Sequence, residues 1–348
     1  MRRLLENYFQ FIKKVIPSKP DQSSVGLDIG TSECKLAEIK KTNHSFELLN
    51  LAIEPVNKGD VKSAIQKCLS RLKKPCESVY TSVFGKGTLI RYIDMPRMSL
   101  NDLHNAFAIE ADKYFPFVQD EVYIDCDILD PQEKASQMLV MAAAAKKDIV
   151  DQRIKLLADL GLSVDFVGMN PVALANAYQA LDKSVEEQSN FSVALLDMGE
   201  SVSSLMIMMN KTPKFHRDIY IGGRELTKRI ASGLGLSFDE AEQLKRQPGS
   251  RLEEIVALCE PVITNIVEEL KLSFDYFTSD IKNREFNKIL LTGGASNFQG
   301  LVPVLEKSLE LKVEHWDPLS FVDAPAAIKD EFKNKSLQLG VVIGLALY

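Results

Sequence analysis

The stretch "VGLDIGTSECK", Val25–Lys35, decides the fold of this chain. An apolar run leads into Asp28 and Gly30, two hydroxyl residues follow, and a second apolar run begins at Cys34. This pattern predicts a strand, a tight turn and a second strand, with an aspartate at the end of the first strand. Glycine lets the backbone approach an anion closely, and successive amides in such a turn can bind phosphate. On its own, the stretch is more typical of an ordinary hairpin turn.

A near copy of the stretch occurs about half a chain length later. The segment "FSVALLDMGESV", Phe191–Val202, places Asp197 where the first stretch has Asp28, and "SSLMIMM" follows as "CKLAEIK" follows the first. Two such hairpins at this spacing predict a duplicated, two-lobed architecture. A hydrated magnesium ion keeps several waters and takes one or two carboxylates. We therefore predict that Asp28 and Asp197 are metal ligands.

A third motif has paired glycines. The segment "KILLTGGASNFQG", Lys288–Gly300, predicts a short strand, a turn at Gly293–Gly294 and then a helix over "QGLVPVLEKSLE". Paired glycines at a strand-to-helix turn let a flat ligand or a phosphate approach the backbone. The chain lacks the G-x-x-x-x-G-K-[ST] pattern of a P-loop.

The composition excludes several classes. The chain has 348 residues, 45% of them hydrophobic, and a net charge of -6, which predicts a soluble protein of two or three domains without a nucleic-acid-binding surface. Its five cysteines form no C-x-x-C pair, so we expect buried, reduced thiols. No stretch reaches the roughly 18 to 20 apolar residues of a membrane span. The C-terminal run "LQLGVVIGLALY" predicts a buried closing helix.

The N-terminal segment "MRRLLENYFQFIKKVIPSK" lacks the pattern of a signal peptide. Its apolar residues fall on one helical face and its basic and polar residues on the other, which predicts an amphipathic helix and tether over residues 1–20. Such a helix could lie on a membrane surface or in a partner's groove. The alternative is that it folds back onto the body of the protein.

The three motifs together resemble those of the actin-like ATPase superfamily, which includes actin, sugar kinases and the division protein FtsA. The resemblance implies an α/β actin-like ATPase fold with two ribonuclease-H-like lobes, and ATP or ADP with Mg²⁺ as cofactors. It also implies two phosphate loops and one adenosine loop. The residues of these loops that we expect to bind the nucleotide are Gly30, Thr31, Ser32, Glu33, Cys34, Lys35, Gly199, Glu200, Ser201, Val202, Gly293, Gly294, Ala295 and Phe298.

Two further segments resemble FtsA-like proteins. The segment "RDIYIGGRELTKRIA" contains Gly222 and Gly223, which we add to the nucleotide-binding residues. The segment "DEAEQLKR" is similar to the helix whose glutamate and lysine approach the ribose and adenine in that family, and Glu242 and Lys245 match them. Three residues apart, the two side chains share one helical face and can reach one ligand.

The region Leu89–Pro171 resembles the PilM family of type IV pilus assembly proteins. The motifs that match are Arg91, Pro96, Glu110-Ala111 and Phe115-Pro116-Phe117, and the resemblance extends over about residues 24 to 348. It implies an inserted subdomain of the FtsA and PilM type in the first lobe. From the residues themselves we expect a helix over Leu100–Phe117, a strand over "MLVMAAAA" and a helix over Asp148–Gly161.

We therefore divide the chain as follows: residues 1–20, N-terminal helix and tether; 21–95 with 169–190 and 338–348, core of the first lobe; 96–168, inserted subdomain; 191–224 with 285–337, core of the second lobe; 225–284, its helical small subdomain.

The PilM resemblance implies a scaffold that binds the cytoplasmic N-terminal tail of a PilN-like inner-membrane protein. The protein would then be cytoplasmic, peripheral to the inner membrane through this partner, and part of the pilus assembly complex. The peptide groove would be walled by residues from about Leu89 to Tyr123. Phe107, Tyr114 and Phe117 could supply its apolar pockets, or could merely pack the insert. Actin-like folds also often self-associate, and a related secretion or competence system would fit equally well.

The alternative is an active ATPase or a small-molecule phosphotransferase. Relatives often carry a carboxylate at the start of the helix that matches "NPVALANAY", where this chain has Asn170. An amide cannot accept a proton as a base, although it can orient water. We therefore expect slow hydrolysis or none. Glu33 and Glu200 are unusual in phosphate loops, and we expect both to point outward because an unpaired carboxylate would repel phosphate.

Overall fold

The computed structural model describes residues 23–42, 45–129, 136–182, 192–280 and 286–348, so the expected N-terminal helix over residues 1–20 lies outside the described residues. The chain divides into two compact units. The first takes the described part of Met1–Asp182 together with Phe321–Glu331 and Val341–Tyr348. The second takes the described part of Lys183–Ser320 together with Phe332–Gly340.

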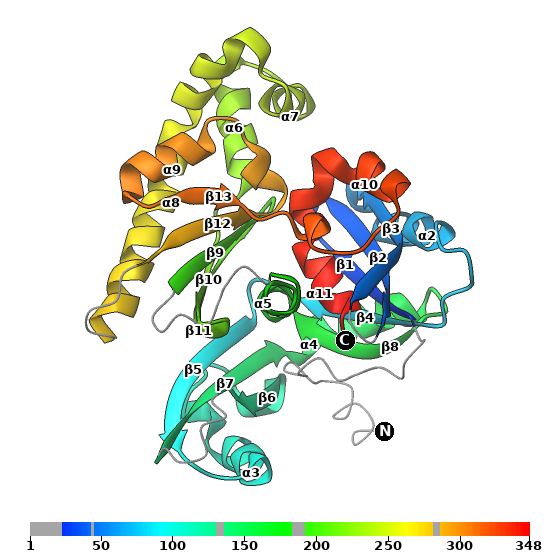
Figure 1. The fold of residues 1–348 in the computed structure, drawn as a ribbon, viewed down its shortest axis with the longest axis vertical. Coiled ribbons are helices and arrows are strands. Elements are labelled where there is room, and N and C mark those ends of the chain that lie inside the picture. The colour runs from blue at the N-terminus through cyan, green and yellow to red at the C-terminus, as the bar shows by residue number, and fades with distance from the viewer. Residues whose placement is uncertain (1–22, 43–44, 130–135, 183–191, 281–285) are drawn as a thin grey trace. The chain divides into compact units, whose positions relative to one another are not determined.

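The first unit is built on a five-stranded sheet of order β3-β2-β1-β4-β8 (Figure 1). Its strands are β1 (Ser23–Ile29), β2 (Glu33–Lys41), β3 (Phe46–Pro55), β4 (Ser78–Val83) and β8 (Ser163–Met169). The first three pair antiparallel, and β4 and β8 continue the sheet parallel to β1. The expected hairpin at the start of the chain is confirmed.

Helices cover both faces of this sheet. Apolar residues of α2 (Val61–Ser70) and α4 (Lys147–Ala158) pack on Leu27 and Ile29 of β1. Gly26 points to the opposite face because side chains alternate along a strand. A Cβ there would lie 2.5 Å from the carbonyl of Val342, so α11 (Gly340–Ala346) lies directly against β1 (Figure 1).

The closing helix predicted for the C-terminal run is therefore confirmed and buried. The remaining helix of this face is α5 (Asn170–Leu181), whose Ala173 carbonyl touches α11 at Gly344. The segment 321–331, which we had placed in the second lobe, pairs with β3 instead. Asp323 accepts a hydrogen bond from the Leu48 amide at 2.7 Å and donates one to the Phe46 carbonyl at 3.1 Å.

Between β4 and α4 the chain forms a three-stranded antiparallel sheet of order β5-β7-β6. Its strands are β5 (Thr88–Pro96), β6 (Val122–Ile128) and β7 (Gln137–Lys146). The helix α3 (Leu100–Glu110) packs against β6 and encloses a separate apolar core with Leu103, Phe107 and Phe115. An inserted subdomain is thus present, but its bounds differ from the predicted 96–168. It begins with β5 at Thr88, whereas α4 packs on the five-stranded sheet and β8 (Ser163–Met169) belongs to that sheet.

Two of the local predictions for this region are confirmed and one is too long. The strand β7 covers "MLVMAAAA", and after α4 the chain turns at Gly161, whose φ is 77°. The predicted helix over Leu100–Phe117 ends at Glu110 and is followed by a 3-10 turn. Proline disfavours a helical conformation in the residue before it, so Pro116 excludes the last predicted turn.

The second unit repeats the plan of the first, with a five-stranded sheet of order β11-β10-β9-β12-β13. Its strands are β9 (Ser192–Met198), β10 (Ser203–Met209), β11 (Thr212–Ile219), β12 (Lys288–Thr292) and β13 (Val313–His315). Three strands again pair antiparallel and two continue parallel. The duplicated architecture predicted from the two Asp-x-Gly segments is confirmed.

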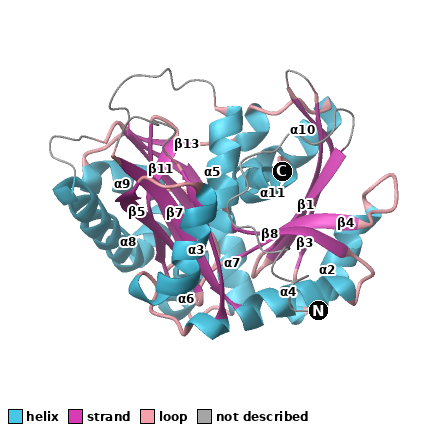
Figure 2. Ribbon diagram, turned by 90° about the horizontal axis from the view of Figure 1, so that it is seen from below, coloured by secondary structure: helices cyan, strands magenta, loops and turns pink. Residues whose placement is uncertain are grey.

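The core of this unit lies between its sheet and the helices α6 (Gly223–Leu234), α7 (Phe238–Arg246), α8 (Leu252–Asp280) and α9 (Leu301–Leu309), of which α8 and α9 are seen beside the sheet in Figure 2. The short helix α10 (Ala326–Phe332) belongs, except for its last residue, to the first unit. The 3-10 helices are Asn57–Gly59, Ala111–Lys113, Gln119–Glu121, Gly249–Arg251, Gly294–Asn297, Pro318–Ser320 and Lys333–Leu339.

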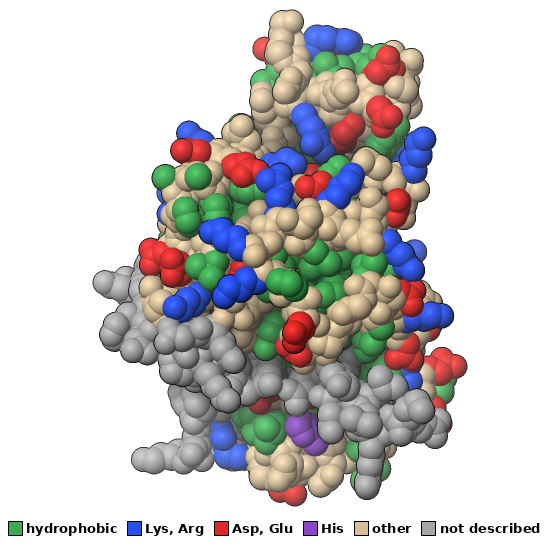
Figure 3. All heavy atoms as spheres, turned by 90° about the vertical axis from the view of Figure 1, so that its right-hand side faces the viewer, with side chains coloured by type: hydrophobic (Ala, Val, Ile, Leu, Met, Phe, Trp, Pro, Cys, Tyr) green, Lys and Arg blue, Asp and Glu red, His purple; other side chains and the backbone are tan. Residues whose placement is uncertain are grey.

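The surface and the thiols agree with the composition. The five cysteines are unpaired, and all but Cys76 are buried. On the face that Figure 3 presents, lysine and arginine side chains are interspersed with aspartate and glutamate. In the part of the chain that the structure describes, no helix combines the length and the apolar character needed to cross a membrane.

Candidate functional site

The two Asp-x-Gly hairpins close in the same way. The amide of Gly30 donates a hydrogen bond to the carbonyl of Glu33 at 3.0 Å, and the amide of Gly199 donates one to the carbonyl of Val202 at 3.0 Å. A Cβ at either glycine would lie within 2.9 Å of that same carbonyl. Both turns therefore require glycine, and the matching motifs fold into matching turns.

In the first unit, Asp28 and Lys35 form an ion pair. They face each other across β1 and β2, and Lys35 Nζ lies 3.0 Å from Asp28 Oδ2. Their side chains are only 6% and 13% exposed, respectively. We had assigned the aspartate to a metal and the lysine to a phosphate, so the structure brings the two predicted residues together. A low dielectric strengthens such a pair relative to one in water.

Arg153 was missed by the sequence analysis. It lies on α4, and its Nη2 donates a long hydrogen bond of 3.5 Å to the carbonyl of Ile29, the residue before Gly30. Its Nη1 is buried and has no hydrogen-bond partner within the described residues. Burial lowers the pKa of the guanidinium, and the nearby carboxylate of Asp28 raises it. No motif points to this residue, because only the packing of α4 on the sheet brings it to the turn.

The other residues of the first turn divide by exposure. Thr31 and Ser32 are exposed, whereas Cys34 is fully buried in the core of the unit. Burial, with a smaller contribution from the Asp28 carboxylate, raises the pKa of the Cys34 thiol to about 11. Cys34 can therefore offer a ligand only its backbone. Glu33 is half-buried at the start of β2.

Asn170 lies at the first position of α5. The hydroxyl of Ser82, in β4, donates a hydrogen bond of 2.7 Å to its side-chain oxygen. This bond fixes the amide group, so that its nitrogen points away from Ser82. An amide held in this way can orient a water molecule but cannot remove a proton from it.

In the second unit, the predicted loops converge at the start of α6. The amides of Gly223 and Arg224 donate hydrogen bonds to the carbonyls of Gly199 and Glu200 at 3.0 and 2.8 Å. A Cβ at Gly222 would lie 2.6 Å from the Gly199 carbonyl, so a glycine is required for this approach. Glu200 and Arg224 are 24 residues apart in the chain. The backbone hydrogen bonds therefore join the FtsA-like segment directly to the second phosphate turn.

The Gly293–Gly294 turn joins this assembly. Gly293 has a φ of 89°, and a Cβ there would collide with the carboxylate of Asp197 and the backbone of Met198. Ala295 lies 3.0 Å from the Cβ position of Gly223. The structure thus brings together the second phosphate turn, the FtsA-like segment and the adenosine turn. That these segments bind a nucleotide was implied by the family resemblance and stays a prediction.

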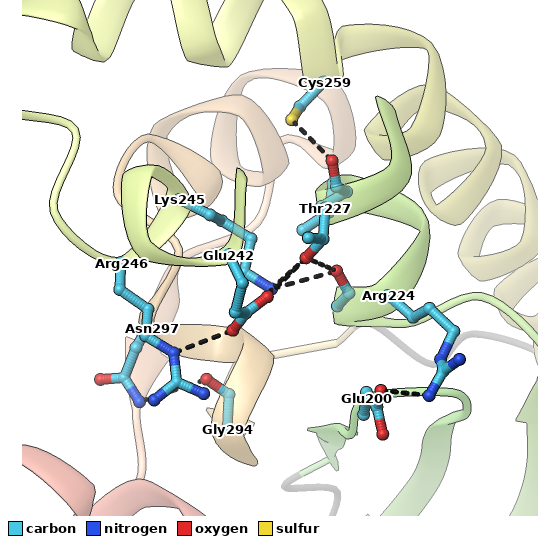
Figure 4. A network of polar contacts seen from close by, with 11 residues as sticks. Glu200, Arg224, Thr227, Glu242, Lys245, Arg246, Cys259, Gly294 and Asn297 are labelled. Atoms are coloured by element: carbon cyan, nitrogen blue, oxygen red, sulfur yellow. Dashed lines mark hydrogen bonds and ion pairs between the residues drawn. The ribbon is translucent and has the colours of Figure 1, made fainter. Parts of the chain in front are cut away.

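Lys245 and Glu242 form the centre of a polar network beneath this assembly (Figure 4). Lys245 Nζ donates to Glu242 Oε2 at 2.6 Å, to Thr227 Oγ1 at 2.8 Å and to the Gly223 carbonyl at 3.1 Å. An ammonium group has three donors, so all of them are used within the protein. Glu242 also accepts from Arg246 Nε at 2.8 Å. The lysine therefore holds α7 against α6, and a ligand would have to displace one of these bonds to reach it.

The network sets the ionisation of the pair. Burial raises the pKa of Glu242, but hydrogen bonds from Lys245, Thr227 and Arg246 outweigh it and leave the pKa below its usual value. Burial lowers the pKa of Lys245 more than Glu242 raises it.

The prediction that Glu200 points outward is wrong. Its side chain is only 19% exposed, and its Oε1 accepts a hydrogen bond from Arg224 Nη2 at 2.6 Å (Figure 4). Its Oε2 is buried with no partner in the described part of the chain. The arginine, which lies over the ring of Phe238, is what permits this carboxylate to stay in the turn.

Phe298, expected near the nucleoside, has its ring buried in the core of the unit.

A cluster of Ser204, His216 and Asp218 was also missed. Asp197, Ser204 and Asp218 face one another across β9, β10 and β11. The Ser204 hydroxyl lies 2.9 Å from His216 Nε2 and 3.0 Å from Asp218 Oδ1, and the same Nε2 lies 3.0 Å from that oxygen. Burial by itself would raise the pKa of Asp218, but the hydrogen bonds with His216 and Ser204 outweigh burial and leave the pKa below its usual value. A serine–histidine–aspartate relay uses both ring nitrogens, so this triangle is not one.

The repeated sheet plan and the joined loops define an actin-like ATPase fold. A structure of MreB 5 of Spiroplasma citri bound to AMPPNP matches with a TM-score of 0.52 and 10% identity, over 94% of this chain and 95% of that chain. The ethanolamine utilization protein EutJ from Carboxydothermus hydrogenoformans matches with a TM-score of 0.54 and 16% identity, over 97% of this chain and 94% of that one. At these identities the likeness concerns the fold alone.

The family follows from the whole chain. The family model described as type IV pilus assembly protein PilM matches residues 26–348, so the chain belongs to the PilM family. A chain of the PilM-PilN type IV pilus biogenesis complex matches with a TM-score of 0.83 and 26% identity, over 94% of this chain and 98% of that one.

FtsA proteins are curated relatives of this chain. The cell division protein FtsA of Enterococcus hirae is 22% identical over 84% of this chain and 78% of its own length. FtsA of Bacillus subtilis is 23% identical over 65% of this chain, and the match spans 58% of its own length. This chain therefore spans little more than half of the latter protein.

Proposed function

We propose that this protein is an ATP-binding scaffold of the type IV pilus inner-membrane assembly complex. In this proposal it binds the cytoplasmic N-terminal tail of a PilN-like membrane protein and is held at the cytoplasmic side of the inner membrane through that partner. The observation that carries the proposal is the similarity to a chain of the PilM-PilN complex, with a TM-score of 0.83 over 94% of this chain.

The loops fit a nucleotide. Gly30 and Gly199 let two matched turns close tightly on their own carbonyl groups, and Gly222 and Gly293 let further backbone approach the second turn closely. Among the described residues there is no cluster of three or more metal-ligating side chains. Magnesium in nucleotide sites usually keeps several waters and takes one or two carboxylates, which a single aspartate per turn can supply. When bound, the ion would neutralise phosphate charge.

Asp28 and Asp197 belong to different units, and the prediction that they share one ion stays a prediction. Slow hydrolysis is the expectation, because the amide of Asn170, held by Ser82, cannot accept a proton as a base. The bound nucleotide would then mainly stabilise the folded protein and would be hydrolysed slowly or not at all. The rise in melting temperature with Mg-ATP measures nucleotide binding directly. A ligand at ~100 times its Kd adds ~2.7 kcal/mol to the free energy of unfolding.

The inserted subdomain offers a surface for the peptide. Strands β5 and β6 form the two edges of its sheet, and α3 packs against β6. An extended peptide can add to such an edge as a further strand. Phe107 is buried in the core of the insert and contacts the ring of Tyr114, so it packs the insert rather than lining a pocket. The exposed large apolar side chains of the insert are Leu100, Ile109 and Val118, and the last two are the most exposed, at 77% and 64%. The Gln119 side chain donates to the carbonyl of Ala108 and holds these two segments together.

A synthetic peptide with the N-terminal tail sequence of a PilN-like membrane protein from the same organism tests the proposal. We expect it to bind the wild-type protein in isothermal titration calorimetry, and Ile109→Asp with Val118→Asp to weaken binding at least tenfold. Leu272→Asp on α8, which is 56% exposed, is the matched control and should bind as wild type does. A peptide that fails to bind wild-type protein at high micromolar concentration would refute the scaffold proposal.

The enzyme alternative gives a different result in a separate assay. An active ATPase or phosphotransferase should release phosphate, or transfer it to a small sugar or alcohol, at about 1 per second or faster. Turnover far below that rate, together with peptide binding, supports the scaffold.

A further inference from the structure

Arg153 is placed at the first phosphate turn by two elements. The helix α4 packs on β4 and β8, and from its second turn Arg153 reaches across to the carbonyl of Ile29, the last residue of β1. Gly30, which the first turn requires, follows directly. The guanidinium therefore lies beside the backbone that we propose to approach a phosphate.

The donors of this guanidinium are not satisfied by the described protein. The bond to Ile29 is long, at 3.5 Å, and Nη1 is buried without a partner among the residues described. A guanidinium stays protonated in proteins, so the group cannot avoid the cost by losing its charge. An unmet buried donor costs about 1 to 3 kcal/mol, and more when it is charged. An anionic ligand that accepts a hydrogen bond from Nη1 of Arg153 would remove this cost.

Neither of the two acidic groups beside Arg153 forms a hydrogen bond with its Nη1 among the described residues. The carboxylate of Asp28 is already ion-paired with Lys35 at 3.0 Å. The thiol of Cys34 is fully buried in the core of the unit, and a thiol is only a weak hydrogen-bond acceptor. The turn therefore holds two cations, Lys35 and Arg153, around one carboxylate. This arrangement attracts a further anion, whereas Asp28 and Lys35 alone would neutralise each other.

We propose that Arg153 binds a phosphate oxygen of the nucleotide seated over the Gly30–Ser32 turn. A planar guanidinium matches the oxygens of a phosphate better than an ammonium does, because it presents two parallel donors. Thr31 and Ser32 are exposed in the same turn, and their hydroxyls can act as further donors. This inference rests on the proposed nucleotide binding and adds to it a residue that the motifs do not contain.

Titration calorimetry with Mg-ATP, Mg-ADP and adenosine tests the inference. We expect Arg153→Gln to weaken Mg-ATP at least tenfold and to leave adenosine unchanged, since only the phosphates contact Arg153. Lys155→Gln is the matched control, because it removes an exposed cation from the same helix. Arg153→Lys keeps the charge and loses the planar fork, so we expect an affinity between those of Arg153→Gln and wild type.

The outcomes separate the two proposals. If wild-type protein binds Mg-ATP and Arg153→Gln binds it equally well, Arg153 is only a structural link between α4 and β1. If wild-type protein binds no nucleotide, the nucleotide part of the proposed function fails and this inference fails with it. If Arg153→Gln does not fold, Arg153→Lys decides: wild-type affinity for Mg-ATP in that variant overturns the inference, and a severalfold loss confined to the phosphorylated ligands supports it.

Discussion

The carboxylate of Asp28 accepts a hydrogen bond from Nζ of Lys35 at 3.0 Å, across two strands of the first hairpin. In the second hairpin, the residue opposite Asp197 is Ser204, which hydrogen-bonds to Asp218. The two hairpins share one backbone turn but surround their aspartates differently. The first aspartate is paired with a cation, and the second lies in a row with another carboxylate.

The pair of Asp28 and Lys35 should be strongly coupled. We expect Asp28→Asn to destabilise the protein by about 3 kcal/mol, because it leaves Lys35 and Arg153 as buried cations without their carboxylate. Lys35→Met should cost less, since Arg153 remains to balance Asp28. The double variant should be more stable than the sum of the single changes implies, by about 1 kcal/mol or more. Urea unfolding of the four proteins measures this cycle.

Additivity of the two changes would show that the ion pair contributes nothing.

The same proteins also test the metal assignment, because Asp28→Asn should abolish the rise in melting temperature with Mg-ATP. An Asp28→Asn protein that responds to Mg-ATP as wild type does would show that Asp28 is not a ligand of the ion. Adenosine alone serves as the control ligand, since its binding involves no metal.

The pair of Glu242 and Lys245 should make stability depend on pH. The folded pKa of Glu242 lies below its ordinary value of 4.5, so its contribution is fully present above pH 4.5 and is lost as the pH falls through the folded pKa. Glu242→Gln should cost about 2 kcal/mol at pH 7, because Lys245 stays buried without its carboxylate. The difference from wild type should shrink below pH 4.5. Unfolding free energies from pH 7 to pH 3 measure it, and a constant difference would contradict the assignment.

The sequence predicted what depends on local patterns. The Asp-x-Gly segments gave both hairpins and the duplication, since an apolar run ending in a glycine turn encodes its own structure. The approach of Gly222 to Gly199 and of Gly293 to Asp197 was expected only through a family resemblance. Such contacts depend on packing between segments far apart in the chain, which periodicity does not report.

The missed residues have the same physical origin. Arg153 reaches the first turn only because α4 packs on the sheet, and no spacing relates it to Gly30. Glu200 was expected outside because an unpaired carboxylate repels phosphate. In the folded protein this carboxylate is not unpaired, because Arg224 forms an ion pair with it. Phe107 is buried for an equally non-local reason, since the inserted subdomain has its own core.

Gly293 should tolerate no side chain. Its φ of 89° disfavours other residues, and a Cβ there would also collide with the Asp197 carboxylate and the Met198 backbone. We expect Gly293→Ala to destabilise the protein by about 3 kcal/mol and to weaken Mg-ATP binding. Gly235→Ala is the matched control, because that glycine also has a positive φ, 67°, but no atom near its Cβ position. It should cost about 1 kcal/mol and leave nucleotide binding unchanged.

Equal effects of the two alanine substitutions on stability and on binding would mean that backbone strain alone matters at Gly293. A larger effect at Gly293 would show that the glycine is needed to position Asp197. Thermal unfolding with and without Mg-ATP separates these cases, because strain lowers the melting temperature without altering the ligand-induced shift.

Arg224 should control how the second turn receives an anion. It pairs with Oε1 of Glu200 at 2.6 Å, and the other carboxylate oxygen is buried. Arg224→Met would leave an unneutralised charge in the turn, so we expect Mg-ATP to bind about tenfold more weakly, by repulsion between the carboxylate and the phosphates. Glu200→Gln in the same protein should restore the affinity, because it removes that charge. Titration calorimetry at low and high salt measures both effects. Failure of Glu200→Gln to restore binding would mean that Arg224 contacts the nucleotide itself, or supports α6, rather than neutralising Glu200.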